Sequence, residues 1–265
     1  MKAIFQILIV LLGFLAISPS AFGQKKNIKT SKWQTTTVII DGKLDGDKDV
    51  LRYYDKRTRI SYDISNDSTT IYLQFKVGDE IAQMKILRAG MVVGLDTVGK
   101  SKQHISIQYP MEGMIKENPE RRQDVRPTAI DIRNKFKLQA QFMVLNGFNS
   151  ENGMSPLQSN SGIVVRLDWN TNNEMIYEVA IPLSSFGKGK LSSSGNERIM
   201  SLNVTLNAVE KPEMNSSAGQ SGGGSGPPPG VGGRPSWVSD GGQSGDFSRL
   251  FEKQKVRVKF RLFMD

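Results

Sequence analysis

The sequence predicts an all-β protein, an antiparallel β-sandwich of about ten strands with an immunoglobulin-like or jelly-roll-like arrangement. Apolar and polar residues alternate over many short segments, which is the pattern of strands with one buried face. Turn-forming residues separate these segments, and no segment shows long helical periodicity. The chain has 265 residues, which is enough for one large domain with a substantial core.

The clearest strand pair spans residues 60–66 and 71–77, on either side of the turn SNDST. Its apolar residues occupy every second position, namely Ile60, Tyr62, Ile64, Ile71, Leu73, Phe75 and Val77. We therefore expect Leu73 and Phe75 in the core, and Gln74 and Lys76 exposed on the opposite face.

Similar patterns predict further strands along the chain. They cover residues 36–40, 84–95, 102–109, 136–145, 163–169, 175–181, 199–209 and 255–263. Pro182 is expected to end one of them, because proline cannot donate a hydrogen bond to the ladder. Short helices are expected near residues 182–186 and 247–252.

Two stretches interrupt the strand pattern. Residues 110–133 contain ENPERRQDVRP and predict a long loop with a helical turn. Residues 214–245 contain SGGGSGPPPGVGGRP, which cannot bury enough apolar area to offset its ordering entropy, and predict a disordered insertion. Because this insertion lies between two patterned segments, residues 24–265 are expected to form a single sandwich domain.

The first 23 residues predict a secretory signal peptide. Lys2 precedes an apolar run over residues 3–17, and small residues precede a cleavage point after Gly23. The run is shorter than the roughly 20 residues of a membrane-spanning helix. We therefore expect a periplasmic or secreted protein with no integral span after cleavage; the alternative is an uncleaved N-terminal anchor.

Charge and cysteine content narrow the function classes. The formal net charge is +9, and Lys2 is the only charged residue before Gln24, so the mature chain carries +9 − 1 = +8. This balance indicates attraction to an anionic surface or polymer, and export without a nucleic-acid motif argues against nucleic acid. The chain has no cysteine, which excludes thiol catalysis, thiolate metal sites and a lipidated cysteine.

Four short motifs follow one another along the chain. Residues 40–45 read IDGKLD, and residues 66–79 carry Asn66, Asp67, the run IYL, Val77 and Asp79. Residues 91–96 form an apolar run that ends in Asp96, and residues 178–186 read EVAIPLSSF. This order resembles the family-9-like carbohydrate-binding modules and their DOMON relatives, although no tryptophan follows the first motif at the usual spacing. The resemblance implies a β-sandwich that holds a sugar between aromatic rings.

Several aromatic side chains could stack on the apolar face of a sugar. The candidates are Trp33, Tyr53, Tyr54, Trp169 and Trp237. Trp169 continues an apolar strand face and is expected in the core, and Trp33 is expected to cover a sheet edge. Trp237 either docks on the sandwich or touches a ligand, and Tyr53 and Tyr54 form the better exposed pair.

The predicted ligand site combines these two tyrosines with three arginines of the 110–133 loop. Arg121, Arg122 and Arg126 provide forked donors that suit carboxylate or phosphate groups, so an acidic or phosphorylated glycan fits this site best. The alternative is a solvated loop beside two tyrosines that cover a sheet edge.

Calcium is the one cofactor for which the sequence offers a ligand pattern. Asp41, Asp45, Asp47 and Asp49 occupy alternate or near-alternate positions in one turn and could supply oxygen ligands. The alternative is that these aspartates bond their own backbone. The resemblance to DOMON relatives, some of which ligate haem with methionine and histidine, raises haem as another possibility. The only histidine, His104, lies on the polar side of its strand and is expected at the surface.

The last predicted strand carries four cations on one face. Lys255, Arg257, Lys259 and Arg261 alternate with apolar residues and form a basic stripe about 20 Å long. Such a stripe either attracts an anionic ligand or keeps a strand edge from pairing with another chain.

No catalytic motif accompanies these features, because the chain has no HExxH helix and no serine nucleophile elbow directly after a predicted strand. We expect an exported, non-catalytic module that binds a glycan or an anionic envelope polymer. The alternatives are a structural or assembly protein of the envelope that binds a protein partner, and a carrier of haem or another small molecule. A flat apolar patch would favour the protein partner.

Overall fold

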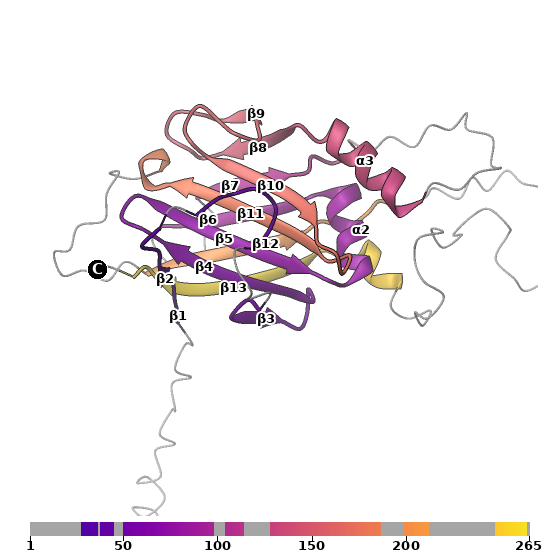
Figure 1. Ribbon diagram of the computed structural model, residues 1–265, viewed down its shortest axis with the longest axis horizontal. Helices are drawn as coiled ribbons and strands as arrows, with labels where there is room; N and C mark the ends of the chain where they lie inside the picture. Colours follow the sequence, from indigo (N-terminus) through magenta and orange to yellow (C-terminus); the bar gives the residue numbers. More distant parts are fainter. Residues whose placement is uncertain are drawn as a thin grey trace, which may run out of the picture.

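The computed structural model describes residues 28–36, 38–44, 50–97, 104–113, 128–186, 199–211 and 247–263. In this part of the chain, thirteen strands form two sheets that pack face to face (Figure 1). The predicted all-β sandwich is therefore confirmed. The predicted signal peptide, residues 1–23, and the predicted insertion, residues 214–245, lie outside the described residues and stay predictions.

The larger sheet has seven strands. Their order is β1 (Lys29–Thr30), β13 (Gln254–Arg261), β12 (Ile199–Leu206), β6 (Met91–Asp96), β7 (Ile105–Tyr109), β8 (Phe142–Asn146) and β9 (Gly153–Pro156). Strands β1 and β13 run parallel, and every other neighbouring pair is antiparallel.

The smaller sheet has six strands. Five of them run in the order β10 (Val164–Trp169), β11 (Met175–Pro182), β5 (Thr70–Val77), β4 (Ile60–Asn66) and β2 (Lys32–Trp33), and β3 (Tyr53–Asp55) also pairs with β4. Only the short pair β2–β4 is parallel. Both sheets are thus mixed, whereas the sequence predicted antiparallel pairing throughout.

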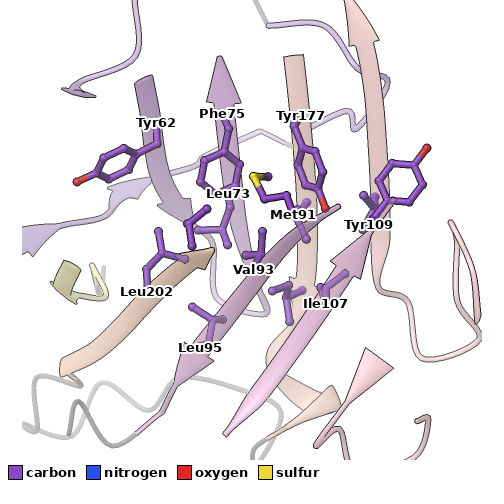
Figure 2. Close-up of a cluster of buried hydrophobic side chains, with 14 of the residues drawn as sticks. Tyr62, Leu73, Phe75, Met91, Val93, Leu95, Ile107, Tyr109, Tyr177 and Leu202 are labelled. Atoms are coloured by element: carbon purple, nitrogen blue, oxygen red, sulfur yellow. The ribbon is translucent and has the colours of Figure 1, made fainter. Parts of the chain in front are cut away.

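One apolar core lies between the two sheets (Figure 2). Leu73 and Phe75 point into it and are almost fully buried, as their alternation predicted. The Phe75 ring meets Tyr177 edge to face, with 5.9 Å between ring centroids. From the larger sheet, Met91 and Val93 approach these side chains across the core.

The opposite face of β5 is not open to solvent, so the prediction that Gln74 and Lys76 are exposed was wrong. Both side chains are half-buried. Gln74 Nε2 donates to Glu178 Oε1 at 2.9 Å, and Lys76 Nζ lies 3.4 Å from Glu174 Oε2. The neighbouring strand and its turn place carboxylates beside these side chains, which alternation alone does not reveal.

Two helices overlap segments that were predicted as strands, and the second also takes in the end of the 110–133 segment, where a helical turn was predicted. The first, α2 (Glu80–Ala89), begins at Asp79, whose side chain accepts from Ala82 N at 2.9 Å, and ends at Gly90, where φ is 79°. The second, α3 (Ala129–Gln139), begins with a capping box formed by Thr128 and Asp131. In each case a helix leads into a strand after only one or two residues, so one apolar pattern ran across both elements.

The position of Leu138 shows why the strand prediction failed. Alternation placed Phe136 and Leu138 on one face, but residues two apart lie about 200° apart around a helix. Phe136 is therefore buried while Leu138 is 79% exposed. The short helices η1 (Leu183–Ser185) and η2 (Phe247–Phe251) lie where they were predicted.

Both α-helices lie at one end of the sandwich (Figure 1). Ile81 and Met84 of α2 pack against Leu250 of η2 in a small cluster apart from the main core. None of the helices described here is long and apolar enough to cross a membrane. The predicted strand at residues 36–40 is missing from the described part, where residues 36 and 38–40 form no strand.

Candidate functional site

The IDG motif and the glutamate of the EVAIP motif meet in a structural contact. The Glu178 carboxylate accepts from Asp41 N at 3.1 Å and from Gly42 N at 2.9 Å. Burial raises the pKa of Glu178, against the effect of these hydrogen bonds and the one from Gln74. Residues 38–44 thereby cross the outer face of the smaller sheet, as the indigo segment in front of β10 and β11 shows (Figure 1).

The Asn66–Asp67 motif is also structural. The Asp67 carboxylate accepts from the backbone of Thr69 and Thr70 at 2.7 and 2.8 Å and from the Tyr72 hydroxyl at 2.7 Å. Burial raises the pKa of Asp67, but these bonds outweigh it and hold the pKa below its usual value. The buried Asn66 amide donates to Phe263 O at 2.9 Å, which ties the β4–β5 turn to the end of the last strand.

The predicted tyrosine pair does not form one stacking surface. Tyr53 and Tyr54 are neighbours on β3 and therefore point to opposite faces. Tyr53 packs on Tyr62 with 5.4 Å between centroids, and Lys29 Nζ lies 4.9 Å from its ring. Tyr54 is 58% exposed. Arg121, Arg122, Arg126 and Trp237 lie outside the described residues, so the composite site stays a prediction.

The other aromatic candidates have packing partners. Trp169 lies against the core, its ring 5.8 Å from that of Phe136, and its indole nitrogen donates to Gln83 Oε1 at 2.9 Å. Trp33 lies on the edge strand β2, with its ring 6.1 Å from that of Phe263. Both positions agree with the expected packing roles.

The predicted calcium ligands cannot be assembled from the described residues. Asp41 Oδ1 accepts from Lys43 N at 2.9 Å, as a turn aspartate does, whereas Asp45, Asp47 and Asp49 lie outside the described part. Within that part, no group of three or more His, Asp or Glu side chains is arranged to hold a metal. His104 is a surface residue, and its Nδ1 lies 3.2 Å from Asp96 Oδ1.

The outer face of the seven-stranded sheet is of a different kind. Its central strands present small polar side chains, and we call these residues the polar face: Ser106, Gln108, Asn146, Ser201, Asn203 and Thr205. The register aligns Arg257, Asn203, Gly94, Ser106 and Asn146 in one row. With strands about 4.8 Å apart, this row is about 19 Å long.

Two side chains at the centre of the polar face have no hydrogen-bond partner among the described residues. Asn203 is 7% exposed and Ser201 is 1% exposed. Within the part of the chain described, Asn203 Oδ1, Asn203 Nδ2 and Ser201 Oγ make no hydrogen bond. Leaving such groups unpaired costs about 1–3 kcal/mol each, so native proteins normally satisfy them with protein, water or ligand.

The four cations of β13 line one side of the polar face. We call Lys255, Arg257, Lys259 and Arg261 the cationic ladder. The partners of the first three across β12 are Thr205, Asn203 and Ser201, none of which is acidic. Lys255 and Arg257 are exposed, and Lys259 and Arg261 are half-buried. Because β1 pairs only with Phe260 and Arg261, most of β13 has no further strand beside it in the described part.

The other side of the polar face is apolar. Phe142 and Val144 point outward from β8, and Met154 lies opposite Val144 on β9. Met154 is 67% exposed, and Phe142 is also exposed. The face thus changes from cationic at β13, through polar groups that include the buried Asp96 opposite Ser201, to apolar at β9.

Sequence reasoning located the cationic ladder but missed the polar face. The signal for it was the segment Ile199–Leu206, which reads IMSLNVTL and alternates as strictly as the strands that were recognised. Its apolar residues were assigned to the core, whereas Ser201, Asn203 and Thr205 were left without a role. Their importance arises from the strand order, which sets them between β13 and β6.

No family model matches the sequence, and no curated protein matches it. Two solved structures of a carbohydrate-binding module of family 9 from Caldicellulosiruptor kristjanssonii are similar in structure, one in complex with glucose and one with cellotriose. They superpose with TM-scores of 0.35 and 0.32 at 13% identity. Both alignments cover 69% of this chain, and 78% and 77% of the modules.

Proposed function

We propose that this protein is an exported, non-catalytic module that binds a glycan on the outer face of its seven-stranded sheet. The observation that carries the proposal is the pair of buried side chains Ser201 and Asn203 at the centre of the polar face, which make no hydrogen bond to any residue that the structure describes. A hydroxyl and an amide offer both donors and acceptors, which matches the hydroxyl groups of a sugar.

The two outer faces of the sandwich differ in what they can offer a ligand. On the smaller sheet, the Glu178 carboxylate accepts hydrogen bonds from the backbone of Asp41 and Gly42, and residues 38–44 cross the outer face. On the larger sheet, α2 contacts the strand β12 as well as η2, and α3 contacts Trp169. Within the described residues, Ser201 Oγ and both amide atoms of Asn203 nevertheless make no hydrogen bond, so these groups are available to a ligand.

A protein partner is the second candidate, and a specific observation favours it. Phe142 and Met154 are large apolar side chains exposed at the β8–β9 edge, and Leu138 is exposed on α3 just before β8. Exposed apolar groups that gather in one region mark interaction sites. The same Phe142 ring could instead stack on a sugar. A direct measurement of glycan binding therefore separates the two candidates.

A glycan array probed with the purified protein tests the proposal. We expect binding by the parent protein, loss of binding by Asn203→Leu, and retained binding by Tyr53→Ala/Tyr54→Ala, which changes a region on the other sheet. If binding survives Asn203→Leu but is lost in Tyr53→Ala/Tyr54→Ala, the site lies at β3 instead. A parent protein that binds no glycan would contradict the proposed function and leave the protein partner as the better candidate.

A further inference from the structure

We infer that the ligand of the polar face is an acidic glycan, whose negative groups lie along the cationic ladder while its hydroxyl groups reach Ser201 and Asn203. This inference rests on the proposed function and specifies its ligand class. The negative groups of the ligand thus contact β13, and not the arginines of the 110–133 loop that the sequence predicted.

The register sets positive charge beside the unpartnered polar groups. Arg257 pairs with Asn203 across the strands, and Lys259 pairs with Ser201. Paired residues of antiparallel strands have Cβ atoms roughly 5 Å apart, so one ligand unit can contact both members of a pair. The forked guanidinium of Arg257 suits a planar carboxylate or a sulfate.

Three members of the cationic ladder, Lys255, Arg257 and Lys259, face no acidic residue on the adjacent strand β12. Their partners on β12 are threonine, asparagine and serine. The acid of the next strand, Asp96, lies opposite Ser201 and contacts His104. Successive cations of the ladder lie about 7 Å apart along the strand and repel one another. Protection of the sheet edge explains the presence of charge on β13, but not the row of buried polar groups beside it.

The hydrogen-bonding needs of the Asn203 amide distinguish an acidic glycan from a polyphosphate. Its Nδ2 needs an acceptor, and its Oδ1 needs a donor. A polyphosphate chain offers acceptors only and would leave Oδ1 unpaired. An acidic glycan offers the anionic group for Arg257 and, on the same sugar ring, hydroxyl groups that both donate and accept.

Binding measurements on the full protein test the inference with four soluble probes: polygalacturonate, dextran sulfate, neutral dextran and inorganic polyphosphate. A fifth probe is phosphatidylcholine vesicles that contain phosphatidylglycerol. We expect polygalacturonate or dextran sulfate to bind at least about tenfold more tightly than dextran and polyphosphate, with an affinity that falls as salt rises.

A matched pair of variants separates the effect of the cationic ladder on affinity from the effect of net charge. Lys255→Gln/Arg257→Gln removes one lysine and one arginine from the ladder, and Lys56→Gln/Arg57→Gln removes the same pair from the exposed turn before β4. The ladder variant should lose about tenfold in affinity for the acidic glycan, and the turn variant less than about twofold. Thermal unfolding checks that both variants are folded.

The outcomes distinguish this inference from the proposed function. If a neutral glycan binds, and binding depends on Asn203 but not on the ladder, the ligand class is wrong and the proposed function stands. Equal losses in both charge variants would also overturn the inference, since the attraction would be non-specific. Ladder-dependent binding of vesicles without glycan binding would overturn both, as would the absence of binding to any probe or array glycan.

Discussion

The Glu178 carboxylate lies 2.9 Å from the backbone nitrogen of Gly42, and this contact holds residues 38–44 on the outer face of the smaller sheet. Gly42 has a φ of 86°, which favours glycine, and a Cβ atom built there would lie 2.8 Å from Asp168 Cβ. The IDG motif therefore needs its glycine for two reasons, backbone conformation and close approach.

Gly42→Ala should destabilise the protein by about 2–4 kcal/mol, the sum of the positive-φ penalty and the steric conflict. Gly153→Ala is the matched control, because Gly153 has a φ of 90° and a Cβ atom added there would meet nothing within 4 Å. It should cost about 1–2 kcal/mol. Urea unfolding of both variants measures the difference, and equal costs would show that residues 38–44 move aside easily.

Glu178 should make the stability depend on pH. Burial raises its pKa in the folded state, so the folded protein holds this proton more tightly than the unfolded chain does. The resulting contribution is present at low pH and is lost as the pH rises from the unfolded value of about 4.3 through the raised folded value.

Glu178→Gln removes this titration while keeping one oxygen to accept from Gly42. The free energy of unfolding of the parent, relative to this variant, should fall as the pH rises from about 4 to 7. Urea unfolding at several pH values measures it. A relative stability of the parent that rises over this range would mean that the backbone hydrogen bonds outweigh burial.

The hairpin of β4 and β5 provides a test of the core. Phe75→Ala should cost roughly 3–5 kcal/mol, because Phe75 is buried against Tyr177. Lys76→Ala should cost less than about 1 kcal/mol, since its ion pair with Glu174 is partly exposed. Similar losses of unfolding free energy in the two variants would contradict the strand register.

The sequence predicted this core well because one buried face imposes a period of two on every strand. It failed where an element's identity depends on its neighbours. The cap at Asp79 and the capping box at Thr128 were visible as residue types, but the apolar positions of α2 and α3 merged with those of the strands that follow.

The candidate site was predictable only in part, for a similar reason. Alternation alone places Lys255, Arg257, Lys259 and Arg261 on one face. It does not reveal that Asn203 lies beside Arg257, or that Gly94 follows in the same row, because strand order joins segments far apart in the sequence. The family motifs, in turn, mark contacts such as Glu178–Gly42 that hold the fold together.

Deleting residues 216–235 should leave the protein folded. The prediction rests on composition and on the pairing of β12 with β13, which continues from Ile199 with Arg261 to Leu206 with Gln254. Loop-closure entropy changes slowly with length, so the unfolding free energy should change by about 1 kcal/mol. Circular dichroism and thermal unfolding check it, and a deletion variant that does not fold would contradict it.

Asn203→Leu should separate stability from binding. In the described part of the unliganded protein, both amide atoms of Asn203 are buried without partners, so replacing them by an apolar side chain of similar size removes an unfavourable term. We expect the free energy of unfolding to stay the same or to rise by about 1 kcal/mol, while glycan binding is lost.

A purely structural role of Asn203 would give the opposite result. If ordered water or another part of the chain satisfies the amide, Asn203→Leu should lower stability by about 1–3 kcal/mol and should weaken binding only in proportion to unfolding. Thermal unfolding with and without an array-identified glycan distinguishes the two cases. The glycan should raise the melting temperature of the parent and leave that of Asn203→Leu unchanged, because only a ligand that binds the folded state stabilises it.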